Sequence, residues 1–488
     1  MAELDEKPFP PGEYPAVVIG SGPGGLQASY CLGRLGVEHA VLSRDETPGG
    51  MFRSFPIYQR LLSWTKPDAP FPPGTREYEW YDHNSLLGEE PEHRAAIVPF
   101  MDRSYMVPSR PEMEQGLAAF AENAGVRVRY GCTWESARRE SDGALALTTS
   151  DGEYRCRAAV FALGVTEPWK SPIPGIEDVP HYADAGKPHE YQGKRVFVIG
   201  KRNSGFELAD GLLPWAQQVF LGSPRPVDTS VIALSSVRVR YLQPYEDAGL
   251  GGGTFALDVA LERIGRTSDG YRIIGAGTTQ EGPLDLEVDE VIAATGFSTP
   301  LRDLTDCGVH TVAQGRIPAM TPYWESEAGS GIYFAGNATQ GSAGLKKHGV
   351  GASSPAVQGF RYNARVMTRH LAATHFDVNP PSERVQPGDL AAYLLREAAH
   401  APELWAQKSY LARVVHGDGE AAILPLSDWL DHPGKGSRAV AVEMNAAGDI
   451  YPAVYVEREG EVSEHLLPPH HLNDFEGEEY VRELASLF

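Results

Sequence analysis

The chain has 488 residues and a net charge of −22, from 43 Lys and Arg against 65 Asp and Glu. At about 150 residues per domain, this length predicts about three domains. A charge balance this acidic disfavours nucleic acid and anionic membranes as partners, because both attract basic surfaces.

No apolar run reaches the ~20 residues that a membrane-spanning helix needs, and the acidic first residues do not resemble a signal peptide. We therefore expect no membrane partner and a cytoplasmic location. The four cysteines are too widely spaced to form a C-x-x-C pair. This spacing is typical of a reducing compartment and excludes a redox dithiol or a zinc ribbon built on such a pair.

The first predicted unit is a strand over 16–19, a helix that ends near Leu35 and a second strand over 39–42. The turn between the first strand and the helix reads Gly20-Ser21-Gly22-Pro23-Gly24-Gly25, which satisfies G-x-G-x-x-G. In such a turn the first glycine permits the bend, the second lets a pyrophosphate approach the backbone, and the third lets helix and strand pack closely. Because a strand and a helix flank the motif, we predict a dinucleotide site with its phosphates at the helix N-terminus.

An acidic residue usually follows the second strand of such a unit and binds the ribose hydroxyls. Ser43 stands at that place here, and Asp45 comes two residues later. Asp45 is our candidate for the ribose contact, and a solvated loop charge is the alternative.

The next hundred residues combine an ordered loop with a helix and short strands. The loop covers the Pro- and aromatic-rich stretch 55–81, and the helix is expected over 112–123. The strands are expected around 126–129, 145–149 and 159–162.

A second strand, turn and helix begin at Arg195. The turn reads Gly200-Lys201-Arg202-Asn203-Ser204-Gly205, so Arg202 replaces the middle glycine and the backbone approaches a pyrophosphate less closely. Lys201 or Arg202 could contact a phosphate directly. The helix is predicted over 206–213 and the following strand over 218–221.

The residues after that strand point to the second nucleotide. They read Gly222-Ser223-Pro224-Arg225, with no acid of the kind that binds the ribose of NAD. Ser223 and Arg225 could hold a 2′-phosphate, which favours NADPH, and an ordinary surface arginine is the alternative. Two dinucleotide folds imply two nucleotides, so we expect NADPH to pass a hydride to a flavin.

The last hundred residues or so, after Asn379-Pro380-Pro381, look like a separate small unit. We expect helices over 390–399, 404–415 and 477–487, and a strand pair over 439–443 and 451–457. The adjacent histidines His470 and His471 cannot easily face one ion, so we predict no metal site. We assign this unit no chemistry, and covering the active site or forming a homodimer contact are its two open roles.

With both motifs in place, the chain resembles the flavin-containing monooxygenases and related NADPH-dependent flavoproteins over about residues 15–372. Pro48-Gly49-Gly50-Met51-Phe52-Arg53 is similar to the family's G-G-x-W segment beside the flavin. Ala294-Thr295-Gly296-Phe297 matches its A-T-G-[FY] element, and Gly331–Asn337 is similar to the strand and turn that pass the ribityl chain. The helix expected from about Ser354 to Ala372 would point its positive end at the flavin.

The resemblance implies an α/β fold with two Rossmann-like dinucleotide-binding domains, to which the pattern of the last hundred residues or so adds a small α+β extension. Its segments are an FAD-binding part over 1–170, an NADPH-binding domain over 171–290, a second FAD-binding part over 291–378 and a C-terminal extension over 379–488.

The implied activity is that of an NADPH-dependent FAD monooxygenase, which oxygenates a nitrogen, sulfur or carbonyl carbon of a small molecule with O₂ through a flavin 4a-hydroperoxide. Two departures point away from this subtype. Gly175 and His181 resemble the F-x-G-x-x-x-H motif at a displaced spacing, and Trp64 or Thr65 stands where relatives place an asparagine. The alternatives are a flavin reductase that passes electrons to a partner and a non-catalytic NADPH-binding regulator.

The candidate residues fall into three groups. The FAD contacts are Gly20, Gly22, Gly25, Asp45, Gly50, Met51, Phe52, Gly336 and Asn337. The NADPH contacts are Gly200, Asn203, Ser204, Gly205, Ser223 and Arg225. The catalytic candidates are Lys66 and His348, for which a solvated lysine and an ordinary loop histidine are the alternatives.

Overall fold

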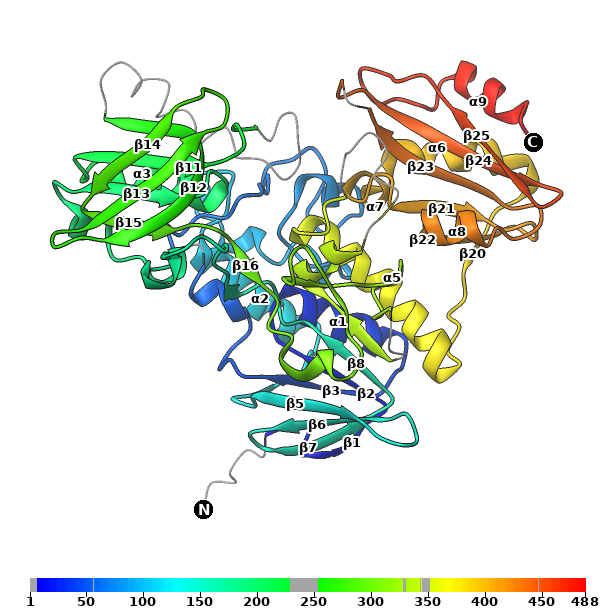
Figure 1. Cartoon of the computed structure of the whole chain (residues 1–488). Coiled ribbons are helices and arrows are strands. Elements are labelled where there is room, and N and C mark those ends of the chain that lie inside the picture. Colours follow the sequence, from blue (N-terminus) through cyan, green and yellow to red (C-terminus); the bar gives the residue numbers. More distant parts are fainter. Residues whose placement is uncertain are drawn as a thin grey trace. The chain divides into compact units, whose positions relative to one another are not determined.

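The computed structural model describes residues 7–55, 57–228, 253–327, 331–342, 344, 352–445 and 447–488. Its contacts divide the chain into two compact units, one made of Met1–Val165 with Thr299–Phe488 and the other of Thr166–Ser298 (Figure 1). Within the described part of the chain, no helix has both the length and the apolar character that a membrane span requires.

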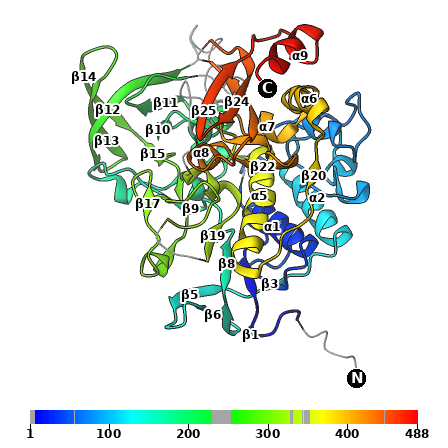
Figure 2. The same ribbon diagram turned by 90° about the vertical axis from the view of Figure 1, so that its right-hand side faces the viewer.

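The first unit is built on a five-stranded parallel sheet in the order β19-β8-β2-β3-β4. Its strands are β2 (Ala16–Ile19), β3 (His39–Ser43), β4 (Arg129–Tyr130), β8 (Ala158–Phe161) and β19 (Ile332–Phe334). Strands β2, β8 and β19 are buried at every position, as expected for a parallel sheet covered on both faces. Helices α1 (Pro23–Arg34) and α5 (Val357–Phe376) run side by side against each other (Figure 2).

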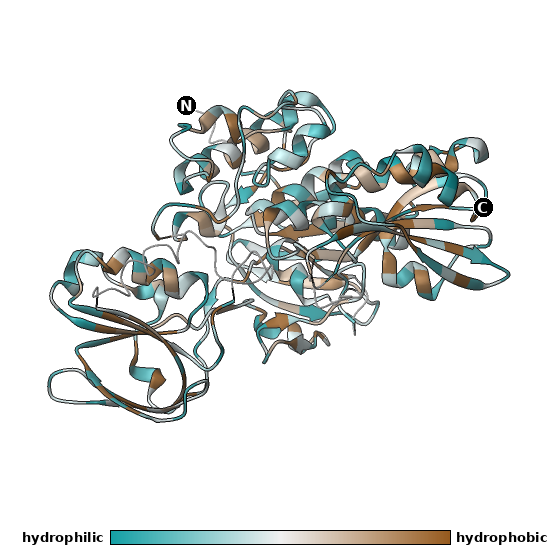
Figure 3. Cartoon of the chain, turned by 90° about the horizontal axis from the view of Figure 1, so that it is seen from above, coloured by the Kyte–Doolittle hydropathy of each residue, from teal (hydrophilic) through white to brown (hydrophobic). Residues whose placement is uncertain are grey.

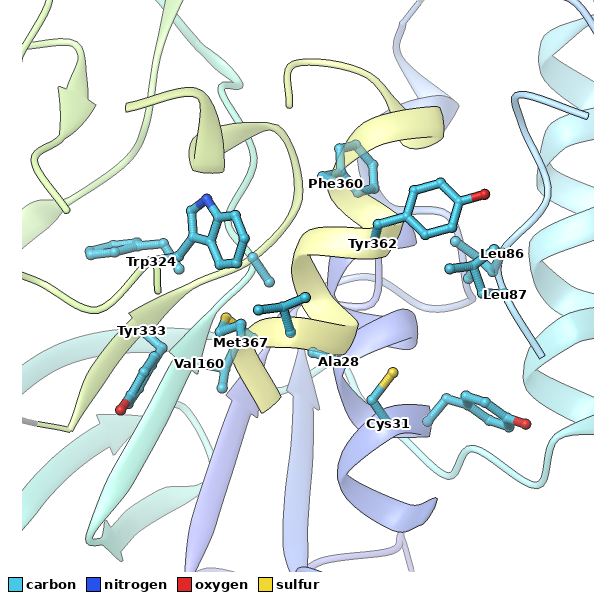
Figure 4. Packing of buried hydrophobic residues seen from close by; sticks show 14 of the residues in the cluster. Ala28, Cys31, Leu86, Leu87, Val160, Trp324, Tyr333, Phe360, Tyr362 and Met367 are labelled. Carbon is cyan, nitrogen blue, oxygen red and sulfur yellow. The ribbon is translucent and has the colours of Figure 1, made fainter. Parts of the chain in front are cut away.

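A second sheet, antiparallel except for one parallel edge pair, completes this core in the order β1-β7-β6-β5. Its strands are β1 (Gly12–Glu13), β5 (Trp134–Arg139), β6 (Leu145–Thr149) and β7 (Gly152–Cys156). Helix α2 (Arg110–Asn123) begins with a capping box, in which Ser109 and Glu112 bond to each other's backbone amides. Figure 4 shows the packing between α5, α1 and the parallel sheet, with side chains from Ala28, Cys31, Val160, Phe360, Tyr362 and Met367.

The second unit contains a six-stranded sheet in the order β14-β13-β12-β11-β10-β15. Its strands are β10 (Arg195–Ile199), β11 (Gln218–Ser223), β12 (Thr254–Arg266), β13 (Tyr271–Gly277), β14 (Pro283–Val288) and β15 (Glu290–Ala293). Strand β10 pairs in parallel with β11 and β15, and helix α3 (Asn203–Leu212) follows it. The parallel strands of the two units, each with a helix after its glycine turn, confirm the predicted α/β class.

The C-terminal residues add a six-stranded sheet to the first unit, in the order β20-β22-β21-β23-β24-β25. Its strands are β20 (Glu383–Arg384), β21 (Leu411–Val415), β22 (Glu420–Pro425), β23 (Arg438–Met444), β24 (Ile450–Arg458) and β25 (Glu461–Leu466). The helices are α6 (Leu390–His400), α7 (Pro402–Ala406), α8 (Leu426–Asp431) and α9 (Glu478–Ala485). Most residues of strands β23 and β24 are buried. Figure 3 shows the hydropathy of each residue, with hydrophobic and hydrophilic residues both present in the sheet near the C-terminus.

The predicted helix over 404–415 is wrong beyond Ala406. Helix α7 ends at Ala406, and residues Leu411–Val415 form β21, which hydrogen-bonds to β22 and β23 on its two sides. Four of its five residues are buried, and a short apolar run of this kind imitates helical spacing. The adjacent valines Val414 and Val415 are β-branched and favour the strand.

A buried ion cluster ties the C-terminal sheet to the loop before α2. The Arg413 guanidinium lies 2.6 Å from a Glu397 carboxylate oxygen and 3.4 Å from one of Glu403. Arg76 reaches the same two carboxylates at 3.3 and 2.8 Å. Burial alone would raise the pKa of Glu403, but the positive charges of Arg76 and Arg413 outweigh it and hold the pKa below its usual value. The stabilisation is therefore present at neutral pH and is lost as the pH falls through that lowered pKa.

We predict that Arg413→Leu lowers the free energy of unfolding by about 3 kcal/mol, because it removes one cation from two buried carboxylates. Urea denaturation at neutral pH measures this change. Arg384→Leu is the matched control, since the Arg384 side chain is 68% exposed and lies 4.0 Å from Asp418. We expect the control to change stability by less than about 0.5 kcal/mol. Equal changes in the free energy of unfolding for the two substitutions would contradict a stabilising role of the Arg413 charge in the buried cluster.

Candidate functional site: two glycine turns

The first glycine turn joins β2 to α1 and leaves the helix N-terminus open. Gly22 is the N-cap residue of α1 and has no side chain that could bond to the free amides of the first turn. Such amides, with the positive end of the helix dipole, form a site for a phosphate group. Gly20 has a φ of +112°, and a methyl group on it would lie 2.4 Å from the Ala162 carbonyl oxygen.

The space around this turn matches the roles that the motif assigns to its glycines. A methyl group on Gly25 would lie 1.9 Å from the Gly20 carbonyl oxygen, so helix and strand can pack only with glycine there. Apart from its chain neighbours, no heavy atom of the described residues lies within 4 Å of the corresponding position on Gly22. The residues present therefore fit a dinucleotide pyrophosphate, which needs open backbone at the second glycine.

Two distant segments meet at the same turn. A methyl group on Gly24 would lie 2.4 Å from the Cα of Gly336, at the start of the short helix η9 (Gly336–Gly341). One on Gly50 would lie 3.6 Å from the Cα of Gly22 and 3.3 Å from a carboxylate oxygen of Asp45. The fold thus brings the predicted FAD residues of three segments together, and their contact with FAD stays a prediction.

The remaining predicted FAD residues surround this junction. Asp45 is half-buried, and its carboxylate accepts a 3.3 Å hydrogen bond from the Ser43 hydroxyl, which also lies 2.8 Å from the Ser21 hydroxyl. Met51 and Phe52 are half-buried in the short helix η1 (Gly50–Arg53). Asn337 is half-buried in η9 and accepts a hydrogen bond from Gln340 through its backbone carbonyl.

The two predicted catalytic residues gain no support. Lys66 is exposed, with its ammonium group 4.8 Å from the centre of the Trp64 ring and 5.8 Å from that of Tyr81. Thr65 beside it is buried and donates a 2.8 Å hydrogen bond to Asp82, which gives it a structural role. His348 lies outside the described residues, and both catalytic assignments stay predictions.

The second glycine turn, between β10 and α3, repeats the construction of the first. Gly200 has a φ of +119°, and a methyl group on it would lie 2.4 Å from the Ala294 carbonyl oxygen. One on Gly205 would lie 2.1 Å from the Gly200 carbonyl oxygen. The N-cap residue of α3 makes no side-chain capping bond, and Asn203 and Ser204 are half-buried in its first turn. This turn therefore also fits a phosphate.

The carbonyl group that packs against the first glycine of each turn belongs to a short sequence that occurs in both halves of the chain. A comparison of the two halves would have found this match. Ala162-Leu163-Gly164 follows β8, and Ala294-Thr295-Gly296 follows β15. Each third residue, Gly164 or Gly296, has a positive φ.

Lys201 is committed to a partner that the sequence pattern missed. Its side chain is only 2% exposed and forms an ion pair with Asp258 of β12, whose second oxygen accepts a 2.7 Å hydrogen bond from Thr279. The bonds from Lys201 and Thr279 lower the pKa of Asp258. The alternative in which Lys201 contacts a phosphate is therefore not supported.

Ser223 and Arg225 lie at the carboxyl end of β11, as the βαβ pattern predicts. Ser223 is half-buried and pairs in register with Asp258, while Arg225 is exposed. An acid thus stands beside this strand end after all, but it comes from the neighbouring strand and is neutralised by Lys201. Only the pairing of β11 with β12 reveals it.

His181 links the segment that follows β15 to the segment that precedes β10, both in the second unit. It is 1% exposed, and its Nδ1 accepts a 3.1 Å hydrogen bond from the Ala183 amide. The proton therefore lies on Nε2, which donates to the Gly296 carbonyl at 2.9 Å. Burial lowers the pKa of His181 and keeps the ring neutral, so this partial motif residue braces the Ala294–Phe297 element. Among the described residues, no three His, Cys, Asp or Glu side chains are arranged to hold a metal ion.

Comparison with known proteins begins with sequence relatives. "FAD-dependent oxidoreductase domain-containing protein 2" of Danio rerio is 25% identical over 456 residues, which cover 82% of this chain and 64% of that protein. The indole-3-pyruvate monooxygenase YUCCA1 of Oryza sativa is 27% identical, over 40% of this chain and 44% of its own length. The ferredoxin–NADP reductase of Thermus thermophilus is 28% identical, over 55% of this chain and 76% of its own length. The chain thus spans less than two thirds of the length of the Danio rerio relative.

Solved structures share the fold across different activities. A flavin-containing monooxygenase from Stenotrophomonas maltophilia has a TM-score of 0.56 at 19% identity, covering 74% of this chain and 98% of its own. A bacillithiol disulfide reductase from Staphylococcus aureus has the same TM-score at 16% identity and the same coverage. At these identities the likeness shows the fold alone.

These findings confirm the predicted resemblance, the fold with two dinucleotide-binding domains, and the class of FAD-dependent oxidoreductase with NADP(H) as second nucleotide. A sequence profile described as "Pyridine nucleotide-disulphide oxidoreductase" matches residues 17–336, which is more than half of the chain. The chain therefore belongs to the pyridine nucleotide-disulphide oxidoreductase family.

Proposed function

We propose that this protein is an NADPH-dependent monooxygenase that uses FAD and O₂ to oxygenate a small molecule. The observation that carries the proposal is the pair of open glycine turns without a dithiol beside them. All four cysteines are free, and Cys31, Cys132 and Cys156 are buried. A reductase that relays electrons through a cysteine pair has no such pair to use here, whereas a flavin that reacts directly with O₂ needs none.

The residues of this chain would bind and orient the two nucleotides. Gly20, Gly22 and Gly25 with the N-terminus of α1 would hold the FAD pyrophosphate, and Asp45 would bind the ribose. The segments at Gly50-Met51-Phe52 and Gly336-Asn337 would contact the flavin. Gly200, Asn203, Ser204 and Gly205 hold the NADPH pyrophosphate, with Ser223 and Arg225 at its 2′-phosphate. Bound FAD supplies hydride acceptance from NADPH and the reaction with O₂.

A flavin reductase that passes electrons to a protein partner is the second candidate. The similarity to the Thermus thermophilus ferredoxin–NADP reductase favours it, because that relative is matched over more of its length than the monooxygenase YUCCA1.

The two enzymatic candidates differ in the fate of O₂. We expect the purified protein to be yellow and to oxidise NADPH faster when a substrate that it can oxygenate is present. With ¹⁸O₂, one ¹⁸O atom should appear in the product. Suitable probes are a tertiary amine, a thioether and indole-3-pyruvate, which represent nitrogen, sulfur and carbonyl-carbon oxygenation. Reduction of ferredoxin or ferricyanide by NADPH, without label in any product, would favour the reductase instead.

Gly22→Val tests the FAD turn. The two methyl groups enter the space that the pyrophosphate needs, while no neighbouring side chain or distant backbone in the described part of the chain lies within 4 Å of the new Cβ. We therefore expect a folded protein without flavin absorbance. Gly33→Val, near the other end of α1, is the matched control, because a Cβ there also meets nothing within 4 Å. Full flavin content in Gly22→Val would contradict the assignment of this turn to FAD.

Arg225→Ala tests the choice of NADPH over NADH. Because Arg225 is exposed, we expect the KM for NADPH to rise by about tenfold, the lower end for a charge-assisted hydrogen bond, and the KM for NADH to stay unchanged. Arg272→Ala removes another exposed arginine of the same unit, paired with Asp285, and should alter neither value. Equal use of both nucleotides by the unmutated protein would refute the specificity.

A further inference from the structure

The C-terminal residues contact η9 and the start of α5 through buried polar side chains. We infer that Gln407, in the turn between α7 and β21, is a positioning residue that holds the flavin-facing turn at Gly336. The inference rests on the proposed FAD site, because Gly336 and the N-terminus of α5 are its second segment. Gln407 and the side chains that it contacts lie beyond the matched family region, which ends at residue 336.

Two side chains separate Gln407 from Gly336. The Gln407 amide donates to the Asn363 carbonyl oxygen, and the Asn363 amide donates to the Thr339 hydroxyl at 3.1 Å. The Thr339 hydroxyl in turn donates to the Gly336 carbonyl at 2.7 Å. Gln407, Asn363 and Thr339 are all at most 1% exposed. Water cannot replace a lost partner at such sites, so each member depends on the next.

Ser354, just before α5, closes this chain into a network. Its hydroxyl accepts hydrogen bonds from the Asn363 amide at 3.0 Å and from the Gln407 amide at 3.2 Å. The neighbouring Ser353 amide donates to the Ala406 carbonyl at 3.0 Å. The same C-terminal turn therefore binds both η9 and the approach to α5.

Tyr410, three residues after Gln407, makes a second set of contacts with the segment around η9. Its hydroxyl lies 2.6 Å from the Ser342 hydroxyl and donates to the Pro322 carbonyl at 2.8 Å. Its ring stacks on Trp324, with the centroids 5.2 Å apart and the planes at 17°. Ser342 follows η9 directly, and its amide donates to the Thr339 carbonyl. The turn is thus held from both of its ends.

A purely space-filling role and a positioning role predict different responses to substitution. Gln407→Met keeps the volume and loses every hydrogen bond, whereas Gln407→Glu keeps an acceptor and loses the donor to Asn363. A buried carboxyl has a raised pKa, so at lower pH the carboxyl group of the Gln407→Glu variant takes up a proton and regains an O–H donor toward Asn363. Recovery of the Gln407→Glu variant at lower pH therefore distinguishes a hydrogen-bonding role of Gln407 from a space-filling role.

The experiment measures FAD binding to the apoprotein by quenching of flavin fluorescence, together with the visible spectrum of the bound flavin. At pH 8 we expect Gln407→Met and Gln407→Glu to raise the Kd for FAD by about tenfold or more, with a shifted flavin spectrum. At pH 6, relative to wild type at the same pH, Gln407→Glu should recover and Gln407→Met should not. Gln386→Met is the matched control, since Gln386 is exposed on the same part of the chain.

The outcomes separate the two proposals. A wild-type apoprotein that binds no FAD overturns the proposed function. Wild-type affinity and an unshifted spectrum in both Gln407 variants overturn the positioning role alone, as does a loss in Gln407→Glu that acidification does not reverse. Should the Gln407 variants fail to fold, Tyr410→Phe decides, because it keeps the ring on Trp324 and removes only the hydroxyl. Unchanged FAD binding in Tyr410→Phe would then overturn the inference, and weaker binding would support it.

Discussion

In both glycine turns, a carbonyl oxygen occupies the place where a side chain would begin. The Ala162 carbonyl lies 2.4 Å from the position of a Cβ on Gly20, and the Ala294 carbonyl stands at the same distance from that on Gly200. Only glycine can accept such an approach together with a positive φ. Because this contact sets where α1 and α3 begin, it also sets where their free amides point. Everything proposed for the two nucleotides depends on that direction.

The first turn is also the meeting point of segments that are far apart in the chain. Gly336 packs against Gly24, and Gly50 packs near Gly22, so glycine backbone lies against glycine backbone on two sides. Contacts between glycine backbones bury little side-chain surface, so the rigidity of this junction has to come from other interactions. Around Gly336 it comes from a buried hydrogen-bond network whose outer members belong to the C-terminal residues.

Local steric requirements could be predicted from the sequence, and contacts between distant segments could not. The glycine spacing at Gly20–Gly25 and at Gly200–Gly205 indicates a turn geometry that depends on a few residues close in sequence. Both turns could therefore be predicted. The pairing of Lys201 with Asp258 depends on the register of β11 with β12, which no local pattern encodes. The helical spacing of Leu404–Val415 failed for a related reason, since strand partners on both sides decided the conformation of β21. The roles of Asp45, Lys66 and His348 depend on where a flavin lies, and they stay predictions.

The order of the network along the chain has a consequence for synthesis. Gly336 leaves the ribosome before Gln407 and Tyr410, by roughly 4–14 s at typical rates of elongation. During this interval the Ser354 hydroxyl and, once it has emerged, the side-chain carbonyl oxygen of Asn363 lack the hydrogen bonds that Gln407 donates to them and are open to water. The network that holds Gly336 is therefore completed only once the chain has been synthesised past Gln407 and Tyr410. A nascent chain that ends between residues 364 and 406 contains both glycine turns and lacks Gln407, the outermost member of the network that holds Gly336.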